Sequence, residues 1–170
     1  MTSSAEAIGV DVGLASFATL SDGTEIFNPR FFRSEEKALK RAQRKLSAQP
    51  VGAPQRRKQR KVVARVHERI ANRRSNFAHQ VSHWLVISFG LIVFEKLNVK
   101  GMVKNNHLSK SISDAAWSQL ISYTTSKAAM RSPVASSWLI HAAPANAARA
   151  VARSSKRVWL SARIIVICAV

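Results

Sequence analysis

Asp11 is the first residue whose surroundings favour chemistry. It lies in the segment Ile8–Leu14, where apolar side chains alternate with Gly9, Asp11 and Gly13 as they do along a β-strand. A glycine on either side of the carboxylate, on the same strand face, leaves space for a metal ion or a phosphate to approach. The alternative is an acid near a strand end that faces water, and this segment alone does not separate the two.

Glu95 is the second candidate. It closes the apolar run Leu91–Phe94, which is typical of a central parallel strand buried on both faces. An acid that directly follows such a strand lies at the carboxyl edge of the sheet, where α/β proteins place their sites. We therefore predict that Asp11 and Glu95 lie on adjacent parallel strands, with carboxylates close enough to share one ion. The alternative for Glu95 is a salt-bridged acid beside Lys96.

The residues around Asp11 are expected to form a small antiparallel unit. Phe17–Leu20 has the composition of a second strand, and Ser21-Asp22-Gly23 has the sequence of a hairpin turn. Thr24–Phe27 then returns as a third strand, which Asn28-Pro29 ends.

Two helices are predicted before the Glu95 strand, over residues 33–49 and 56–88, with a Pro- and Gly-containing break at 49–54. Glu35 and Glu36 are expected in the first turn of the first helix, where the helix dipole favours acids. Apolar residues recur at helical spacing: Leu39, Ala42 and Leu46 in the first helix, and Val62, Val66, Ile70, Phe77, Val81 and Trp84 or Leu85 in the second.

The surface of this helical pair is strongly basic. From Arg30 to Arg74 the sequence has sixteen Lys and Arg residues against three acids, whereas a solvated helix surface usually mixes both signs. The bias favours a surface that follows nucleic-acid phosphates over a merely soluble helix pair. The predicted nucleic-acid-binding residues are Lys37, Lys40, Arg41, Arg44, Lys45, Arg56, Arg57, Lys58, Arg60, Lys61, Arg65, Arg69, Arg73, Arg74, Lys100 and Lys104.

After the Glu95 strand, residues 98–106 are expected to form a polar loop. Ser113 is predicted to cap a helix that starts at Asp114. The inner face of that helix is expected to consist of Trp117, Leu120, Ile121 and Thr124.

The whole chain is basic too: its 170 residues carry 27 Lys and Arg against 9 Asp and Glu, a net charge of +18. A polyanionic partner is expected. Nucleic acid is favoured over a membrane, because no apolar run reaches the roughly 18–20 residues that span a bilayer. Met1–Ala7 lacks the basic start of a signal peptide, and the single Cys168 excludes an internal disulfide. We expect a cytoplasmic protein.

Seven tracts occur in order along the chain: GVDVGL, SDG-T, NPRF, LKRAQRKLS, VARVHERIANRRSNFAHQVS, LIVFEKLNVKGMVKN and LSKSISDAAW. Together they cover about residues 8–127, and they resemble the TnpB family, also called OrfB, of insertion-sequence transposon proteins. Relatives in this family act as RNA-guided DNA endonucleases with a RuvC-like nuclease domain.

The resemblance implies a fold, a metal site and partners. The family's nuclease holds two divalent metals with three acids, and the motifs assign the first acid to Asp11 and the second to Glu95. Their oxygen ligands suit Mg²⁺ or Mn²⁺. The implied fold is α/β: a partial RNase H-like (RuvC-type) mixed sheet, with the long basic helical pair inserted at about 33–88. The implied partners are DNA and guide RNA, with no membrane.

The chain also departs from the family's pattern. The family has a nucleic-acid-binding region before the strand that here begins at Ile8. After the second acid the family has two Cys-x-x-Cys pairs, which form a zinc ribbon, and then its third acid. Here Cys168 stands alone and Asp114 is the last acidic residue. We therefore expect a partial RuvC-like domain over 1–127, with a weak or incomplete Mg²⁺ or Mn²⁺ site and no zinc site.

The tail, residues 128–170, is expected to be aberrant or disordered and to add no ordered core. It is rich in Ala, Arg and Ser and contains no carboxylate side chain. Ile140-His141, Pro144-Ala145-Asn146 and Ser155–Leu160 can each be encoded by codons that, in one shifted frame, give Asp-Pro, Ser-Gln and Gln-Lys-Ser-Leu-Ala tracts of the family. A frameshift after about Lys127 is therefore favoured over a genuine disordered basic tail.

These residues favour a truncated TnpB-like protein that binds nucleic acid and is catalytically inactive as it stands. An active nuclease would need a third metal-binding acid. The alternative from another class is a basic structural RNA-binding protein without nuclease ancestry, which would have no use for Asp11 and Glu95. His79 and His83 are four residues apart and could share a metal, but without an adjacent cysteine or acid they are favoured as surface or interface residues.

Overall fold

A computed structural model describes residues 7–95, 99–102, 104, 108–131 and 164–168. The chain divides into two compact units. Residues 1–29 and 78–170 form the first unit, and residues 30–77 form the second.

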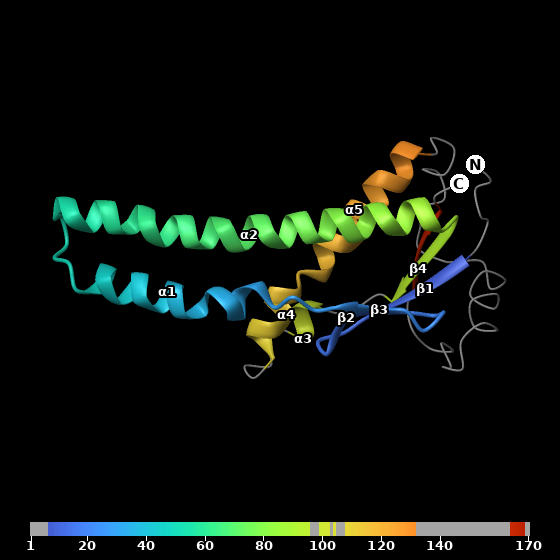
Figure 1. Ribbon diagram of the computed structural model, residues 1–170, viewed down its shortest axis with the longest axis horizontal. Coiled ribbons are helices and arrows are strands. Elements are labelled where there is room, and N and C mark those ends of the chain that lie inside the picture. Colours follow the sequence, from blue (N-terminus) through green and yellow to red (C-terminus); the bar gives the residue numbers. More distant parts are fainter. Residues whose placement is uncertain (1–6, 96–98, 103, 105–107, 132–163, 169–170) are drawn as a thin grey trace. The chain divides into compact units, whose positions relative to one another are not determined.

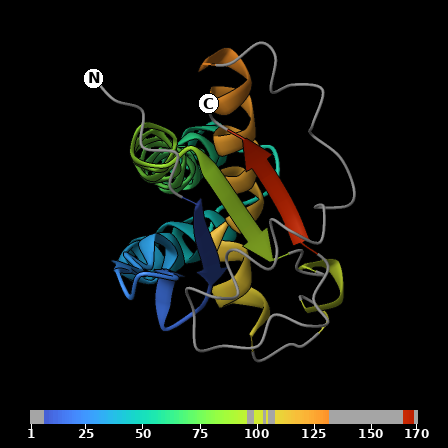
Figure 2. The same cartoon turned by 90° about the vertical axis from the view of Figure 1, so that its right-hand side faces the viewer.

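A five-stranded mixed sheet organises the first unit (Figures 1 and 2). Its strands are β1 (Ala7–Val12), β2 (Ser16–Leu20), β3 (Glu25–Phe27), β4 (Leu91–Glu95) and β5 (Ile164–Cys168), in the order β3-β2-β1-β4-β5. β1 pairs antiparallel with β2 and parallel with β4, and the remaining pairs are antiparallel. The predicted α/β class, with a mixed sheet that carries both acids, is confirmed.

The turn between β2 and β3 forms where the sequence predicts it. Gly23 has a φ of 91°, a conformation that glycine adopts without a steric penalty. The backbone N–H of Thr24 donates to Asp22 Oδ1 at 2.8 Å, which closes the turn. Ser21 ties the turn to β1, because its Oγ accepts from Gly9 N at 3.1 Å and its N–H donates to Gly9 O at 2.9 Å.

The interior positions of β4 are deeply buried. Ile92, Val93 and Phe94 have relative exposures of 0%, 3% and 0%, so consecutive side chains on both faces of the sheet are covered. This burial confirms the prediction from the continuous apolar run.

The helices after β4 differ from the sequence prediction. A single helical turn, α3 (Val99–Met102), lies in the expected polar loop, of which residues 98, 103, 105 and 106 lie outside the described residues. α4 (Ser109–Ala115) starts well before the predicted cap, so Ser113 lies inside a helix. Ala116, with a φ of 53°, ends α4. The next helix is therefore a separate element, α5 (Trp117–Arg131).

The inner face of α5 is largely as predicted. Trp117, Leu120 and Thr124 are buried together with Ala128, and Ile121 is partly exposed. Thr124 Oγ1 donates to the carbonyl of Leu120 at 2.8 Å, which satisfies its buried hydroxyl.

α5 also packs on the end of α2 (Pro54–Ser88) that belongs to the first unit. The His79 ring stacks on the Tyr123 ring, with centroids 3.9 Å apart. The Lys127 ammonium donates to the carbonyl of His79 and to Ser82 Oγ, and burial lowers the pKa of Lys127 below its ordinary value. His79 is therefore an interface histidine, as favoured from the sequence.

β5 lies in the tail for which no ordered core was predicted. It pairs antiparallel with β4, from Leu91↔Cys168 to Glu95↔Ile164. The physical reason is that the run Ile164–Ile167 has high β-propensity, and β4 offers a strand edge that β1 does not occupy. Residues 132–163 and 169–170 lie outside the described residues, so the aberrant origin of the tail stays a prediction.

The second unit is an antiparallel helical pair (Figure 1). α1 (Phe31–Ser47) lies beside the part of α2 from Pro54 to Phe77, and the predicted break connects them. Leu39, Val66 and Ile70 form the buried centre, against which Phe31, Phe32 and Val63 pack.

One position of the predicted α2 seam is wrong, because Val62 is 41% exposed whereas the neighbouring Val63 packs on the core. The prediction of Trp84 or Leu85 is confirmed for Leu85, which is fully buried, whereas Trp84 is 41% exposed. Adjacent apolar residues on a helix point about 100° apart, so only the tertiary partner decides which of two is buried.

The same change, Phe to Ala, should affect stability very differently at buried Phe94 and at exposed Phe27. Phe94→Ala leaves a cavity in the sheet core and is expected to lower the free energy of unfolding by about 3–5 kcal/mol. Phe27→Ala, at a position 80% exposed, is expected to change it by less than about 0.5 kcal/mol. Urea denaturation followed by circular dichroism measures both, and equal losses of stability would contradict this description of the core.

Candidate functional site

The two predicted acids lie on neighbouring strands. β1 and β4 pair in parallel from Ala7↔Leu91 to Val10↔Phe94. Asp11 and Glu95 are the next residues on these strands, so the same register aligns them. Aligned residues of adjacent parallel strands are about 4.8 Å apart at Cα and project to the same face. The predicted placement of the two acids on adjacent parallel strands is confirmed.

The glycines beside Asp11 have structural roles of their own. Gly9 exchanges hydrogen bonds with Ser21, as described above. A Cβ at Gly13 would lie 3.1 Å from the Ser16 carbonyl oxygen, so the close backbone turn into β2 accounts for this glycine. A close backbone approach therefore accounts for Gly13, and the glycine pattern is not by itself a sign of ligand space.

The pair of acids offers a limited ligand set. Asp11 and Glu95 are both partly exposed, and carboxylate oxygens are the ligands that Mg²⁺ and Mn²⁺ prefer. Within the described part of the chain, no group of three or more His, Cys, Asp or Glu side chains could hold a metal ion. The sharing of one divalent ion by these two carboxylates therefore stays a prediction.

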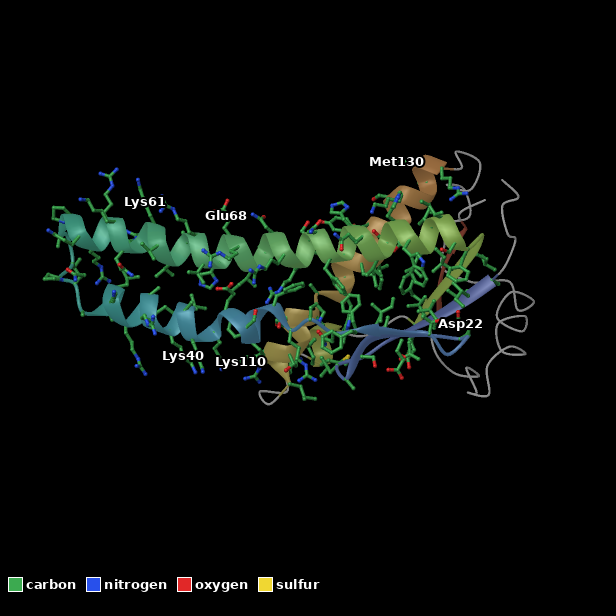
Figure 3. The ribbon with its side chains drawn as sticks, viewed as in Figure 1. Asp22, Lys40, Lys61, Glu68, Lys110 and Met130 are labelled. Carbon is green, nitrogen blue, oxygen red and sulfur yellow. The ribbon has the colours of Figure 1, made fainter. Side chains whose placement is uncertain are left out.

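The predicted basic residues of α1 and α2 are mostly exposed. In Figure 3, Lys40 projects from α1 away from α2, and Lys61 projects from α2 away from α1. We call the following exposed side chains the basic surface: Lys37, Lys40, Arg41, Arg44, Lys45, Arg57, Lys58, Arg60, Lys61, Arg65, Arg69 and Arg73. Arg74 is partly buried. Lys104 is exposed but lies in the first unit, and the side chain of Lys100 lies outside the described residues.

Arg56 differs from the rest, because its guanidinium closes the end of α1. Its Nη1 donates to the carbonyls of Leu46 at 3.1 Å and Gln49 at 2.7 Å. The last carbonyls of a helix lack partners within the helix. Arg56 therefore has a structural role that the sequence did not predict.

Glu35 is a second feature that the sequence prediction missed. α1 begins at Phe31, so Glu35 and Glu36 lie beyond the first turn and the predicted dipole role is wrong. Glu35 is buried and forms ion pairs with Arg69 at 3.4 Å and Arg73 at 3.1 Å. Its position four residues before Leu39, on the same helix face, is the sequence signal that could have placed it toward α2.

Arg69 and Arg73 also line a hollow of about 450 Å³ on the second unit. Its lining residues all come from α2: Arg65, Glu68, Arg69, Asn72, Arg73 and Asn76.

No helix among the described residues is both long and apolar enough to cross a membrane.

Comparison with known proteins identifies the family. Residues 2–106 match the OrfB_IS605 family, described as "Probable transposase". The chain belongs to this transposase family. The resemblance to TnpB (OrfB) proteins that the sequence motifs indicated is thus confirmed.

The curated relatives of this chain are much longer than it is. A "Putative RNA-guided DNA endonuclease" of Streptomyces pristinaespiralis is 43% identical over 123 residues, which are 72% of this chain and 31% of the relative. "Putative RNA-guided DNA endonuclease InsQ" of Escherichia coli K12 is 34% identical over 133 residues, 69% of this chain and 33% of the relative. The chain spans about a third of the length of these relatives.

Arg56 and the adjacent Arg57 provide a matched test of the structural role assigned to Arg56. Arg56→Gln removes the hydrogen bonds to the Leu46 carbonyl in the last turn of α1 and to the Gln49 carbonyl just beyond the helix, and we expect it to lower the free energy of unfolding by about 1 kcal/mol. Arg57→Gln removes the same charge from an exposed position and should leave stability within about 0.5 kcal/mol. Thermal and urea unfolding measure both, and equal effects would mean that Arg56 does not close α1.

Proposed function

We propose that this chain binds nucleic acid through the basic surface of α1 and α2 and does not cleave DNA as it stands. The observation that supports binding most directly is the exposure of the basic surface within a segment that has sixteen basic residues and three acids. Such a charge density attracts phosphates without sequence preference and releases the counterions bound to them.

The sheet is proposed to be a partial RNase H-like domain of the RuvC type. Membership of the transposase family and the parallel β1–β4 pair that carries Asp11 and Glu95 support this assignment. Because relatives are named RNA-guided DNA endonucleases, DNA and a guide RNA are the proposed partners.

Asp11 and Glu95 are proposed to share one Mg²⁺ or Mn²⁺ ion. In phosphodiester cleavage, bound divalent metals activate water and stabilise the leaving oxygen. The resemblance implies three acids for this task, and no acidic residue follows Asp114 in the chain. The two carboxylates alone should bind the ion weakly, so binding of nucleic acid rather than its cleavage is the function that the residues support best.

Binding predicts a change in salt dependence. Replacing Arg57, Lys58, Arg60 and Lys61 together by Gln should weaken binding to all sequences alike and flatten the log–log salt slope by about one unit for each phosphate that is no longer neutralised. Fluorescence anisotropy of a labelled single-stranded DNA over a range of KCl concentrations measures the slope. Lys110→Gln, an exposed change on α4, should leave it unaltered. If the variant with all four substitutions has the same salt slope as the parent, the proposed surface is refuted.

The incomplete acid set predicts the absence of cleavage. With Mg²⁺ or Mn²⁺ and a DNA target, with or without a guide RNA, the chain should give no product above that of Asp11→Asn and Glu95→Gln variants. Gel electrophoresis of end-labelled DNA measures this. Metal-dependent cleavage by the parent that both substitutions abolish would show that two acids suffice and would overturn the inactive assignment.

A further inference from the structure

Three of the arginines that line the hollow on α2 lie in a row along one face of the helix. Arg65, Arg69 and Arg73 follow one another at intervals of four residues, so their side chains emerge about 6 Å apart. Asn72 and Asn76 lie between and beside them, and their amides can donate to or accept from sugars and bases. The lining is therefore rich in donors suited to a polyanion.

Glu35 fixes two of these arginines from the α1 side. Its Oε2 lies 3.4 Å from Arg69 Nη1, and its Oε1 lies 3.1 Å from Arg73 Nη1, so each oxygen engages one guanidinium. The Glu35 side chain is only 11% exposed, whereas those of Arg69 and Arg73 are 56% and 50% exposed. The carboxylate is buried beneath two cations that remain half open to solvent.

This arrangement orients the guanidiniums before any ligand arrives. A guanidinium has five N–H donors in a rigid plane, and the contact with Glu35 is made through Nη1 of each arginine. The cost of immobilising long side chains on binding falls when another contact already holds them.

We propose that the hollow binds a phosphodiester of a nucleic-acid backbone, with Arg69 and Arg73 as its donors and Glu35 as their positioning residue. The inference rests on the proposed function and adds to it a defined subsite. It assigns an acid a favourable role in binding an anion, which long-range electrostatics alone would not predict.

Glu68 supplies a matched control, because it lines the same hollow and points away from α1 (Figure 3). Glu35→Gln and Glu68→Gln each remove one negative charge with almost no change of shape. If charge alone mattered, both changes would tighten binding. Since Glu35 orients the two arginines, we expect Glu35→Gln to weaken binding about threefold or more, while Glu68→Gln tightens it slightly.

Arginine-to-lysine changes supply a second test that does not alter net charge. Lysine lacks the planar fork that contacts an acid and a phosphate at once. Arg69→Lys with Arg73→Lys should weaken binding, whereas Arg33→Lys, at an exposed position of α1 that pairs with Glu36 and lies outside the basic surface, should not. This comparison decides the question should Glu35→Gln fail to fold.

The measurement is anisotropy of labelled single-stranded DNA and RNA of one sequence, with circular dichroism to confirm folding of each variant. Weaker binding by Glu35→Gln and by the Arg69/Arg73 lysine variant, with neither control weakened, supports the subsite. Equal effects of Glu35→Gln and Glu68→Gln, or of the Arg69/Arg73 lysine variant and Arg33→Lys, would overturn it. If inorganic phosphate at the same concentration as the oligonucleotide displaces it, the hollow is a site for small anions and the proposed phosphodiester subsite is overturned. If the variant with Arg57, Lys58, Arg60 and Lys61 replaced by Gln also keeps the parent's salt slope, the proposed function itself fails.

Discussion

The parallel pairing of β1 with β4 is the constraint on which the rest of the structure depends. Parallel strands cannot be joined by a tight turn, so a long connection must separate them in sequence. In this chain the connection contains the β2–β3 hairpin and both long helices. The same pairing sets the register that aligns Asp11 with Glu95, residues that are more than eighty positions apart in the sequence.

The connection between β1 and β4 contains most of the basic residues of the chain, and it has to fold despite the repulsion between their positive charges. Fifteen cations on two helices repel one another, and three acids offset little of that repulsion. The structure uses two of the acids at specific positions: Glu36 pairs along α1 with Arg33 and Lys40, and Glu35 pairs with Arg69 and Arg73 of α2. Each exposed ion pair contributes little, so the apolar centre around Leu39 and Ile70 must supply most of the stability.

A surface built in this way keeps its cations available to a polyanion. Most of the basic side chains are exposed, and their mutual repulsion is relieved when phosphates bind. The charge pattern that destabilises the isolated helical pair is therefore the same pattern on which the proposed binding of nucleic acid rests. The chain belongs to a family described as probable transposases, and the proposed metal site on its sheet rests on Asp11 and Glu95.

Local sequence determined much of this protein. The period-two pattern around Asp11, the continuous apolar run before Glu95 and the Asp22-Gly23 turn each predicted the strand or turn that the structure contains, because alternation, burial and glycine conformations are properties of short segments. The basic bias and the family motifs are likewise carried by the residues themselves. Only the tertiary structure decided that Val63 rather than Val62 packs in the core, that Ala116 separates α4 from α5, and that Ile164–Cys168 pairs with β4. The tertiary structure also placed Glu35 as a buried partner of Arg69 and Arg73. It placed Arg56 of α2 against the carbonyls at the end of α1. Each of these depends on which distant segment lies opposite. Helical spacing, such as that of Glu35 and Leu39, can place a residue on the inner face of its helix, but it does not identify the residues that it contacts on the other helix.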